Sequence, residues 1–156
     1  MKFLDIGEVA ERLHLSGVLH AQRNRLEDAE RLIRAALDVL PDEAMFHNNL
    51  ANVCVERGML AEAESLYVRA IELDGARLDA LNNLGLLLSR TGRPEDAERL
   101  LRRAVELAPD NIDFRQNLAN QYNRMGRVPD ALQQCHDGLV RAPRSRVLRG
   151  LLVLAY

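Results

Sequence analysis

The sequence contains no tryptophan, only 4% aromatic residues, and a single lysine, Lys2, among its 156 residues. A core without large rings has to be built from leucine, alanine, valine and isoleucine, which favours closely packed helices over a β-sandwich. With 47% apolar and 28% charged residues, the chain is expected to fold rather than remain disordered. The use of arginine for almost every basic residue suggests a bacterial genome of high GC content.

Long apolar runs are also missing. No segment approaches the roughly 18 consecutive apolar residues of a membrane helix, so we expect no membrane insertion. Acidic residues interrupt the segment from Met1 to Glu8, which is therefore unlike a signal peptide. The two cysteines, Cys54 and Cys135, are far apart and fit neither a disulfide framework nor a metal motif. We therefore expect a cytoplasmic protein.

The sequence has little excess charge of either sign. Its net charge of −2 argues against a general nucleic-acid binder. The charge is unevenly distributed, because residues 1–78 carry 9 basic and 14 acidic side chains, whereas residues 79–156 carry 12 and 9.

Motifs of catalysis and cofactor binding are missing as well. There is no glycine-rich phosphate loop, GxSxG or HExxH. No two histidines have the i, i+4 spacing of a zinc site with an acidic partner, so His14, His20, His47 and His136 are interpreted as structural. We predict a protein that is not an enzyme and that has no cofactor or metal site.

A pattern that recurs every 34 residues dominates what is present. It reads Asn-Asn-Leu-Ala-Asn at 48–52, Asn-Asn-Leu-Gly-Leu at 82–86 and Gln-Asn-Leu-Ala-Asn at 116–120. So many coincident positions at one period indicate a repeat protein. The predicted repeats are 10–43, 44–77, 78–111 and 112–145, preceded by a lead-in at 1–9 and followed by a partial fifth repeat at 146–156.

Each repeat is predicted to form two antiparallel helices. Gly58, Gly92 and Gly126 stand at position 15, where a left-handed residue ends the first helix; the first repeat has Asn24 there. A proline or glycine at position 32 ends the second helix. Positions 8 and 20 hold only glycine or alanine, so that two helix axes can approach closely. Helix breaks are expected near residues 24, 41, 58, 75, 92, 109, 126 and 143.

These positions resemble the tetratricopeptide-repeat family. The matches are leucine at position 7, glycine or alanine at 8, glycine at 15, alanine at 20 and 27, and proline at 32. The first repeat departs most, with Ser16 at position 7, and position 4 holds His47 or Leu81 instead of one recurring bulky residue. The resemblance implies an all-α, right-handed superhelical solenoid whose first helices line a concave groove that binds peptides or protein surfaces.

Amide side chains collect on one side of the predicted first helices. Positions 2, 5, 6, 9, 12 and 13 lie opposite the apolar, packed side. Asparagine is a poor helix residue, yet an amide offers both a donor and an acceptor to an extended peptide backbone. The predicted peptide-binding residues are Asn48, Asn49, Asn52, Asn82, Asn83, Arg90, Gln116, Asn117, Asn120, Asn123 and Arg124.

The asparagines at position 6 permit two interpretations. Asn49, Asn83 and Asn117 are similar to the asparagine ladder in the repeats of O-linked N-acetylglucosamine transferases. Alternatively, they are common family residues that were copied with the repeat. A clamp for the carboxylate of a chaperone C-terminus is not expected, because it needs cations at positions 5 and 9. Those positions hold His14 and Val18, Asn48 and Asn52, Asn82 and Leu86, and Gln116 and Asn120.

The last predicted helix is almost entirely apolar. Residues 146–156 therefore do not form a solubilising cap, and several exposed leucines should find a partner. Either the natural protein continues beyond this helix, or the helix docks against another copy. The predicted self-association residues are Leu151, Leu152, Leu154 and Tyr156.

From these observations we predict a protein-interaction scaffold with a protein or peptide partner. Two alternatives stay open. The chain could be the substrate-recruiting module of a larger enzyme, such as a glycosyltransferase or methyltransferase, or it could be a self-assembling structural scaffold.

Overall fold

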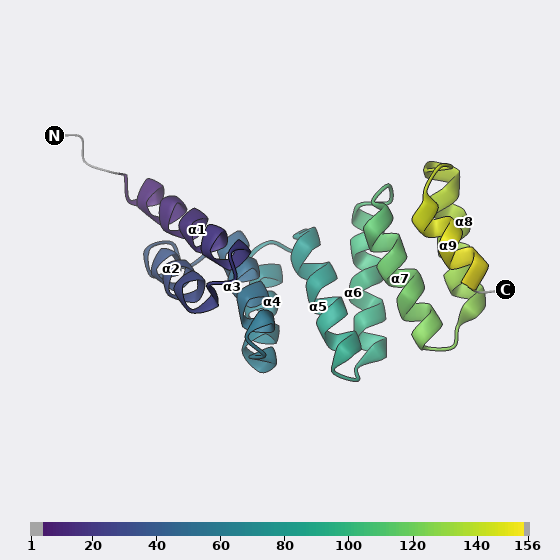
Figure 1. The fold of residues 1–156 in the computed structure, drawn as a ribbon, viewed down its shortest axis with the longest axis horizontal. Helices are drawn as coiled ribbons and strands as arrows, with labels where there is room; N and C mark the ends of the chain where they lie inside the picture. The colour runs from purple at the N-terminus through teal and green to yellow at the C-terminus, as the bar shows by residue number, and fades with distance from the viewer. Residues whose placement is uncertain (1–4, 155–156) are drawn as a thin grey trace. The chain divides into compact units, whose positions relative to one another are not determined.

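The computed structural model describes residues 5–154, with side chains as far as Leu152, and every regular element in that range is a helix (Figure 1). This confirms the predicted all-α fold. The helices fall into two compact units, divided between Ala80 and Leu81, and each unit is described by itself.

Consecutive helices make up both units. The first unit contains α1 (Ile6–Gln22), α2 (Leu26–Val39), α3 (Ala44–Glu56) and α4 (Leu60–Leu73). The second contains α6 (Pro94–Leu107), α7 (Ile112–Arg124), α8 (Val128–Arg141) and α9 (Arg146–Leu154). It also contains α5 (Leu78–Arg90), except for the first three residues of that helix, which belong to the first unit.

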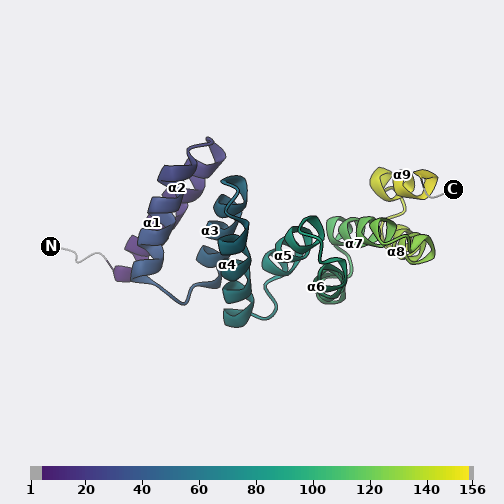
Figure 2. The same ribbon diagram turned by 90° about the horizontal axis from the view of Figure 1, so that it is seen from below.

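Neighbouring helices pack as antiparallel pairs. In the first unit α1 packs against α2 and α3 against α4, while α2 also contacts α3. In the second unit α7 packs against α6 and α8, and α9 lies on α8. Figures 1 and 2 show these pairs side by side from two directions.

The predicted helix breaks are all present. Asn24, Gly58 and Gly92 have φ angles of 57°, 77° and 83°, and Gly126 follows the same pattern at 73°. Each of these residues lies in the short turn within a pair, where the left-handed conformation ends the first helix. The second helices end two residues before Pro41, Pro109 and Pro143.

The first helix begins earlier than the repeat boundary at residue 10 suggests. α1 starts at Ile6, because the Asp5 carboxylate accepts a hydrogen bond from the Gly7 amide at 3.2 Å and caps the helix. Residues 6–9 of the lead-in predicted at 1–9 are therefore helical.

Small residues sit where the two helices of a pair are closest. A Cβ atom added at Gly17 would lie 2.6 Å from Ile33 Cγ1 and 3.1 Å from the carbonyl oxygen of Ala29. At Gly85 it would lie 2.8 Å from Leu101 Cγ. Glycine at position 8 therefore occurs in the repeats that carry a branched aliphatic residue at position 24.

Position 4 has a role that the sequence did not reveal. His47 Nε2 lies 2.8 Å from the carbonyl oxygen of Pro41, and Arg115 Nε donates to the carbonyl oxygen of Pro109 at 2.8 Å. Arg149 makes the same bond to Pro143. A polar residue at position 4 thus binds the carbonyl group of the proline that ends the preceding helix.

The last helix is held by a buried leucine. Leu148 is fully buried, and a Cβ atom added at Gly138 would lie 2.5 Å from Leu148 Cδ1. The earlier repeats have alanine where Gly138 stands. The glycine therefore makes room for α9 against α8.

His14 is buried in the contact between α1 and α3. Its ring stacks on Phe46 with the ring centroids 4.2 Å apart. Burial, and secondarily the positive charge of Arg77, lower the pKa of His14 below its ordinary value. The sequence placed His14 on the groove side and did not indicate this burial.

The close contact at Gly17 predicts a stability change of unusual sign. Replacing Gly17 with alanine should lower the free energy of unfolding by about 1–3 kcal/mol through overpacking against Ile33, despite the better helix propensity of alanine. The matched control is Gly150→Ala in α9, where an added Cβ meets nothing within 4 Å. That change should instead stabilise the protein, by up to about 1 kcal/mol. Urea unfolding followed by circular dichroism measures both, and equal effects of the two changes would contradict the packing argument.

The buried His14 predicts a loss of stability in mild acid. Because its pKa is lowered in the folded state, the unfolded chain binds the proton more tightly. The stability that neutral His14 contributes is complete above about pH 6.5 and is lost as the pH falls toward the folded-state value. Urea unfolding at neutral and mildly acidic pH should show this decrease, and His14→Phe should reduce it. A matched His136→Gln change, at an exposed site, is the comparison, and an unchanged pH dependence in His14→Phe would refute the assignment.

Candidate functional site

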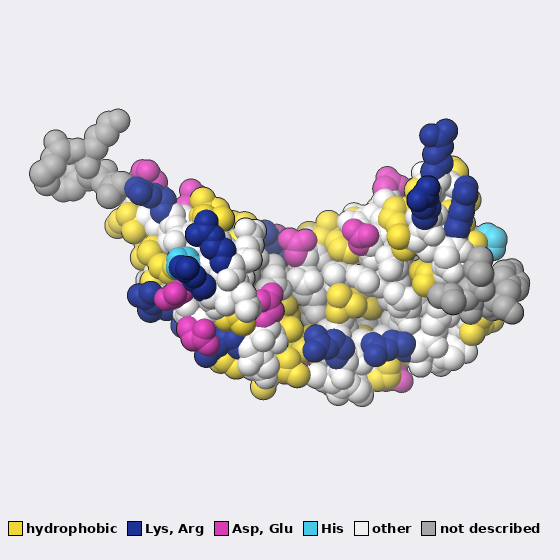
Figure 3. Space-filling model, in the orientation of Figure 1, with side chains coloured by type: hydrophobic (Ala, Val, Ile, Leu, Met, Phe, Trp, Pro, Cys, Tyr) yellow, Lys and Arg dark blue, Asp and Glu magenta, His cyan; other side chains and the backbone are white. Residues whose placement is uncertain are grey.

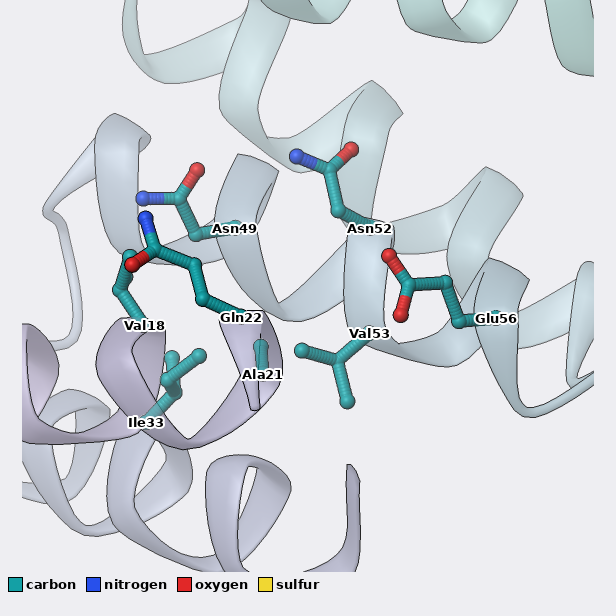
Figure 4. Close-up of a pocket in the computed structure, with 8 residues that line it drawn as sticks. All are labelled: Val18, Ala21, Gln22, Ile33, Asn49, Asn52, Val53 and Glu56. Carbon is teal, nitrogen blue, oxygen red and sulfur yellow. The ribbon is translucent and has the colours of Figure 1, made fainter. Parts of the chain in front are cut away.

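A small hollow lies on the first-helix side of the first unit. Its volume is about 180 Å³. We call this space the first-unit hollow. Its lining residues are Val18, Ala21, Gln22, Ile33, Asn49, Asn52, Val53 and Glu56. Figure 4 shows the Asn49 and Asn52 amides on one side of this hollow and the side chains of Val18, Ile33 and Val53 on the other. It therefore combines an apolar floor with polar groups at its rim.

A larger hollow lies between α5 and α7 in the second unit. Its volume is about 430 Å³. We call this space the second-unit hollow. Its lining residues are Leu86, Ser89, Asn117, Asn120, Gln121, Asn123 and Arg124. Four of them were predicted as peptide-binding residues from the sequence, so the fold does bring part of that set together.

The recurring asparagines connect successive first helices. Asn49 Nδ2 lies 2.9 Å from His14 Nε2, so that α3 is joined to α1. In the second unit, Asn117 Nδ2 donates to Asn82 Oδ1 at 2.8 Å and joins α7 to α5. Position 6 of one repeat thus binds position 5 of the repeat before it. These amides have a structural role, and each retains only part of its hydrogen-bonding capacity for a ligand.

The asparagines at position 5 are buried. Asn48 is 3% exposed and Asn82 is 9% exposed. Asn48 donates to Asn49 Oδ1 at 3.2 Å, and Asn82 donates to Asn83 Oδ1 at 3.4 Å. Their side chains therefore support their neighbours inside the helix contact instead of presenting an open surface, which the helical wheel did not indicate.

A hydrogen-bond chain forms one wall of the second-unit hollow. Arg124 Nη1 donates to Ser89 Oγ at 3.0 Å, and Ser89 Oγ donates to Gln121 Oε1 at 2.5 Å. Gln121 Nε2 in turn donates to the carbonyl oxygen of Pro94 at 2.9 Å. Gln121 is buried. It was not predicted as a site residue, because position 10 belongs to the packed side of the first helix. Its amide fixes Ser89 and thereby the guanidinium of Arg124.

Asn52 is oriented by a buried tyrosine from the second helix of its pair. The Tyr67 hydroxyl donates to Asn52 Oδ1 at 2.6 Å. Burial raises the pKa of Tyr67 strongly, with smaller contributions from Cys54 and Glu56, so the hydroxyl remains a donor at neutral pH. The sequence offered no signal for this contact.

The other predicted peptide-binding residues differ in their surroundings. Asn120 and Asn123 line the second-unit hollow half-buried and have no hydrogen bond to another side chain of the described residues. Gln116 is half-buried, and Arg90 is exposed but does not line the hollow. Among the amides that line this hollow, those of Asn120 and Asn123 are therefore available to a ligand.

The predicted self-association residues are only partly described. Leu151 and Leu152 of α9 are half-buried, whereas the side chain of Leu154 and all of Tyr156 lie outside the described residues. Val140 of the neighbouring helix α8 is 82% exposed. Figure 3 shows basic side chains over α8 and α9, consistent with the exposed arginines there. This end of the second unit carries an apolar and basic surface.

Ionisable groups do not assemble into a metal site within residues 5–152, where no cluster of three or more histidine, cysteine or acidic side chains could hold an ion. Cys54 and Cys135 are buried free thiols, and burial raises the pKa of both. Within the described part of the chain, no helix has both the length and the apolar character needed to cross a membrane.

Many solved structures share the fold, and three of them are the following. The MamA protein is similar with a TM-score of 0.82 at 20% identity, over 96% of this chain and 82% of that chain. YrrB, a tetratricopeptide-repeat protein with an unusual peptide-binding site, has a TM-score of 0.75 at 24% identity, over 92% and 74% of the two chains. The first tetratricopeptide-repeat domain of Spaghetti, bound to an HSP90 peptide, has a TM-score of 0.73 at 20% identity, over 77% and 95%.

Sequence models of one family match most of the chain. One tetratricopeptide-repeat model matches residues 42–110, and a second matches residues 90–152. A comparison with curated proteins found no match. The matched ranges include the 34-residue period, the left-handed turns at Gly58, Gly92 and Gly126, and the helices from α3 to α8. The chain belongs to the tetratricopeptide-repeat family.

Proposed function

We propose that this protein is a non-catalytic interaction scaffold that binds an extended peptide or a protein surface on the side of its first helices. The observation that carries the proposal is the second-unit hollow, where Asn117, Asn120, Asn123 and Arg124 line one space of about 430 Å³. Amide groups with spare donors and acceptors suit a peptide backbone, and an arginine suits a carboxylate.

The similar structures support a peptide as the ligand. The Spaghetti domain was solved with an HSP90 peptide, and YrrB has a peptide-binding site. The absence of cations at positions 5 and 9 of the repeats argues against a carboxylate clamp of the kind described above.

The position-6 asparagines are not the best test of this function. A change of Asn49 or Asn117 to alanine would also remove a hydrogen bond between successive first helices. Weaker binding could then follow from altered helix packing. Asn120 and Asn123 separate the two effects, because neither makes a hydrogen bond to another side chain of the described residues.

The double change Asn120→Ala and Asn123→Ala should weaken peptide binding. Each hydrogen bond to a ligand is worth about 0.5–1.5 kcal/mol, so a loss of roughly tenfold in affinity is expected. Short peptides selected from a random-sequence library against the intact protein serve as ligands, and fluorescence anisotropy measures their affinity. The control is Arg103→Ala with His136→Ala, two exposed residues on second helices. Unchanged affinity in the asparagine variant, with normal helicity, would place the ligand elsewhere.

Self-association through α9 is a second candidate, favoured by the apolar surface at Val140 and the half-buried Leu151 and Leu152. If this helix docks against another copy, changing Leu152 and Leu154 to serine should shift the protein toward monomer. Light scattering at high protein concentration measures the shift. A wild-type protein that is strictly monomeric under these conditions would exclude the candidate. Attachment to a larger enzyme and a cytoplasmic location remain predictions from the sequence.

A further inference from the structure

We propose that the first-unit hollow selects an apolar side chain of the partner peptide that lies next to a lysine or arginine. This inference rests on the proposed peptide-binding function and specifies the chemistry of the ligand. It follows from the floor of the hollow, from the one charge at its rim, and from the contrast with the second-unit hollow.

The floor of the hollow is apolar. Ile33 is fully buried and Val53 is 2% exposed, and Val18 and Ala21 complete the apolar side (Figure 4). An apolar cavity of about 150 Å³ holds a molecule of the size of benzene. The space of about 180 Å³ therefore matches one aliphatic or aromatic side chain of a peptide.

A side chain on this floor would place the peptide backbone among amides. Gln22 is exposed at the rim and makes no hydrogen bond to another described side chain. Asn49 uses one donor toward His14 and accepts one bond from Asn48, which leaves one N–H and one lone pair. The backbone groups beside the buried side chain therefore have partners within the same hollow.

Glu56 gives the rim a negative charge. It is the only ionisable residue among those that line the hollow, it is exposed, and it forms no ion pair with any described residue. The neighbouring Arg57 does not neutralise it, because its guanidinium is engaged by Glu27 and Glu30. An exposed carboxylate beside an apolar pocket favours a cationic group on the ligand that occupies the pocket.

The charge of the whole first unit acts in the same direction. Residues 1–80 carry nine basic and fifteen acidic side chains. A net negative unit attracts basic peptides over a distance comparable with the Debye length. The Glu56 carboxylate and the net negative charge of the unit thus both favour positively charged ligands.

The second-unit hollow has the opposite character. Its only ionisable lining residue is Arg124, and Leu86 is its only aliphatic one. A polar or acidic segment suits it better than an apolar and basic one. The two hollows therefore provide internal controls for each other, because a charge change in one should not alter the preference of the other.

The experiment starts from the random-sequence peptide library described above, with the intact protein as bait. The selected peptides should be enriched in an apolar residue adjacent to lysine or arginine. For a peptide with leucine beside lysine, Glu56→Gln should lower the affinity by about two- to fivefold, the range expected for one exposed charge pair. When glutamate replaces the lysine of this peptide, its affinity for the Glu56→Gln variant should equal or exceed its affinity for the wild-type protein.

Two further variants separate the possible outcomes. Arg124→Gln should leave the affinity for the leucine–lysine peptide unchanged. Ala21→Leu, which fills the hollow, should lower the affinity for that peptide by about tenfold, both with glutamate and with glutamine at residue 56. Circular dichroism verifies that each variant is helical.

The results distinguish this inference from the function on which it rests. Binding that responds to Asn120→Ala with Asn123→Ala, but to neither Glu56→Gln nor Ala21→Leu, would overturn the inference and leave the proposed function standing. A library that yields no binding peptide would overturn both. Enrichment of acidic neighbours beside the apolar residue would also overturn the inference.

Discussion

The close approach of the two helices in each pair is the constraint on which the other features of the structure depend. The alanines at position 20 carry it: Ala29, Ala63 and Ala97 are fully buried, and Ala131 is 2% exposed. A larger residue there would push the helix axes apart. Glycine at position 8 extends the same contact, because Ile33 and Leu101 occupy the space that a Cβ atom would need. With the axes fixed in this way, the side chains on the opposite side of each first helix point in a defined direction.

That opposite side serves two purposes. The residues at positions 5 and 6 join successive first helices, as in the contacts of Asn49 with His14 and of Asn117 with Asn82. Residues further along the helix, such as Asn120 and Asn123, face a hollow. An amide suits both tasks because it is donor and acceptor together. A single recurring residue type therefore supports the stack at one position and remains open to a ligand at another.

Charged residues divide in a similar way. Arg34 pairs with Glu62 at 2.5 Å and Arg127 with Glu98 at 2.7 Å, so these pairs connect consecutive repeats. Each such pair is partly exposed and contributes little stability by itself. Glu56 has no such partner among the described residues, and the Arg124 guanidinium bonds only a hydroxyl group. The ionisable residue that lines each hollow, Glu56 or Arg124, is thus not used in a pair between repeats, and it can determine which ligands are favoured.

The sequence by itself determined the fold class, the repeat period and the helix breaks, since each depends on local chemistry. A glycine or asparagine at position 15 adopts a left-handed conformation, a proline stops a helix, and a small residue allows close packing wherever it recurs. The sequence also identified the side of the first helices on which Asn117, Asn120, Asn123 and Arg124 gather. Only the tertiary structure decided which of these groups are engaged. The burial of His14, Asn48 and Asn82, the bond from Tyr67 to Asn52 and the wall formed by Gln121 all join residues from different helices. A helical wheel describes one helix at a time, so it cannot show which polar groups are used by the next helix and which remain for a partner.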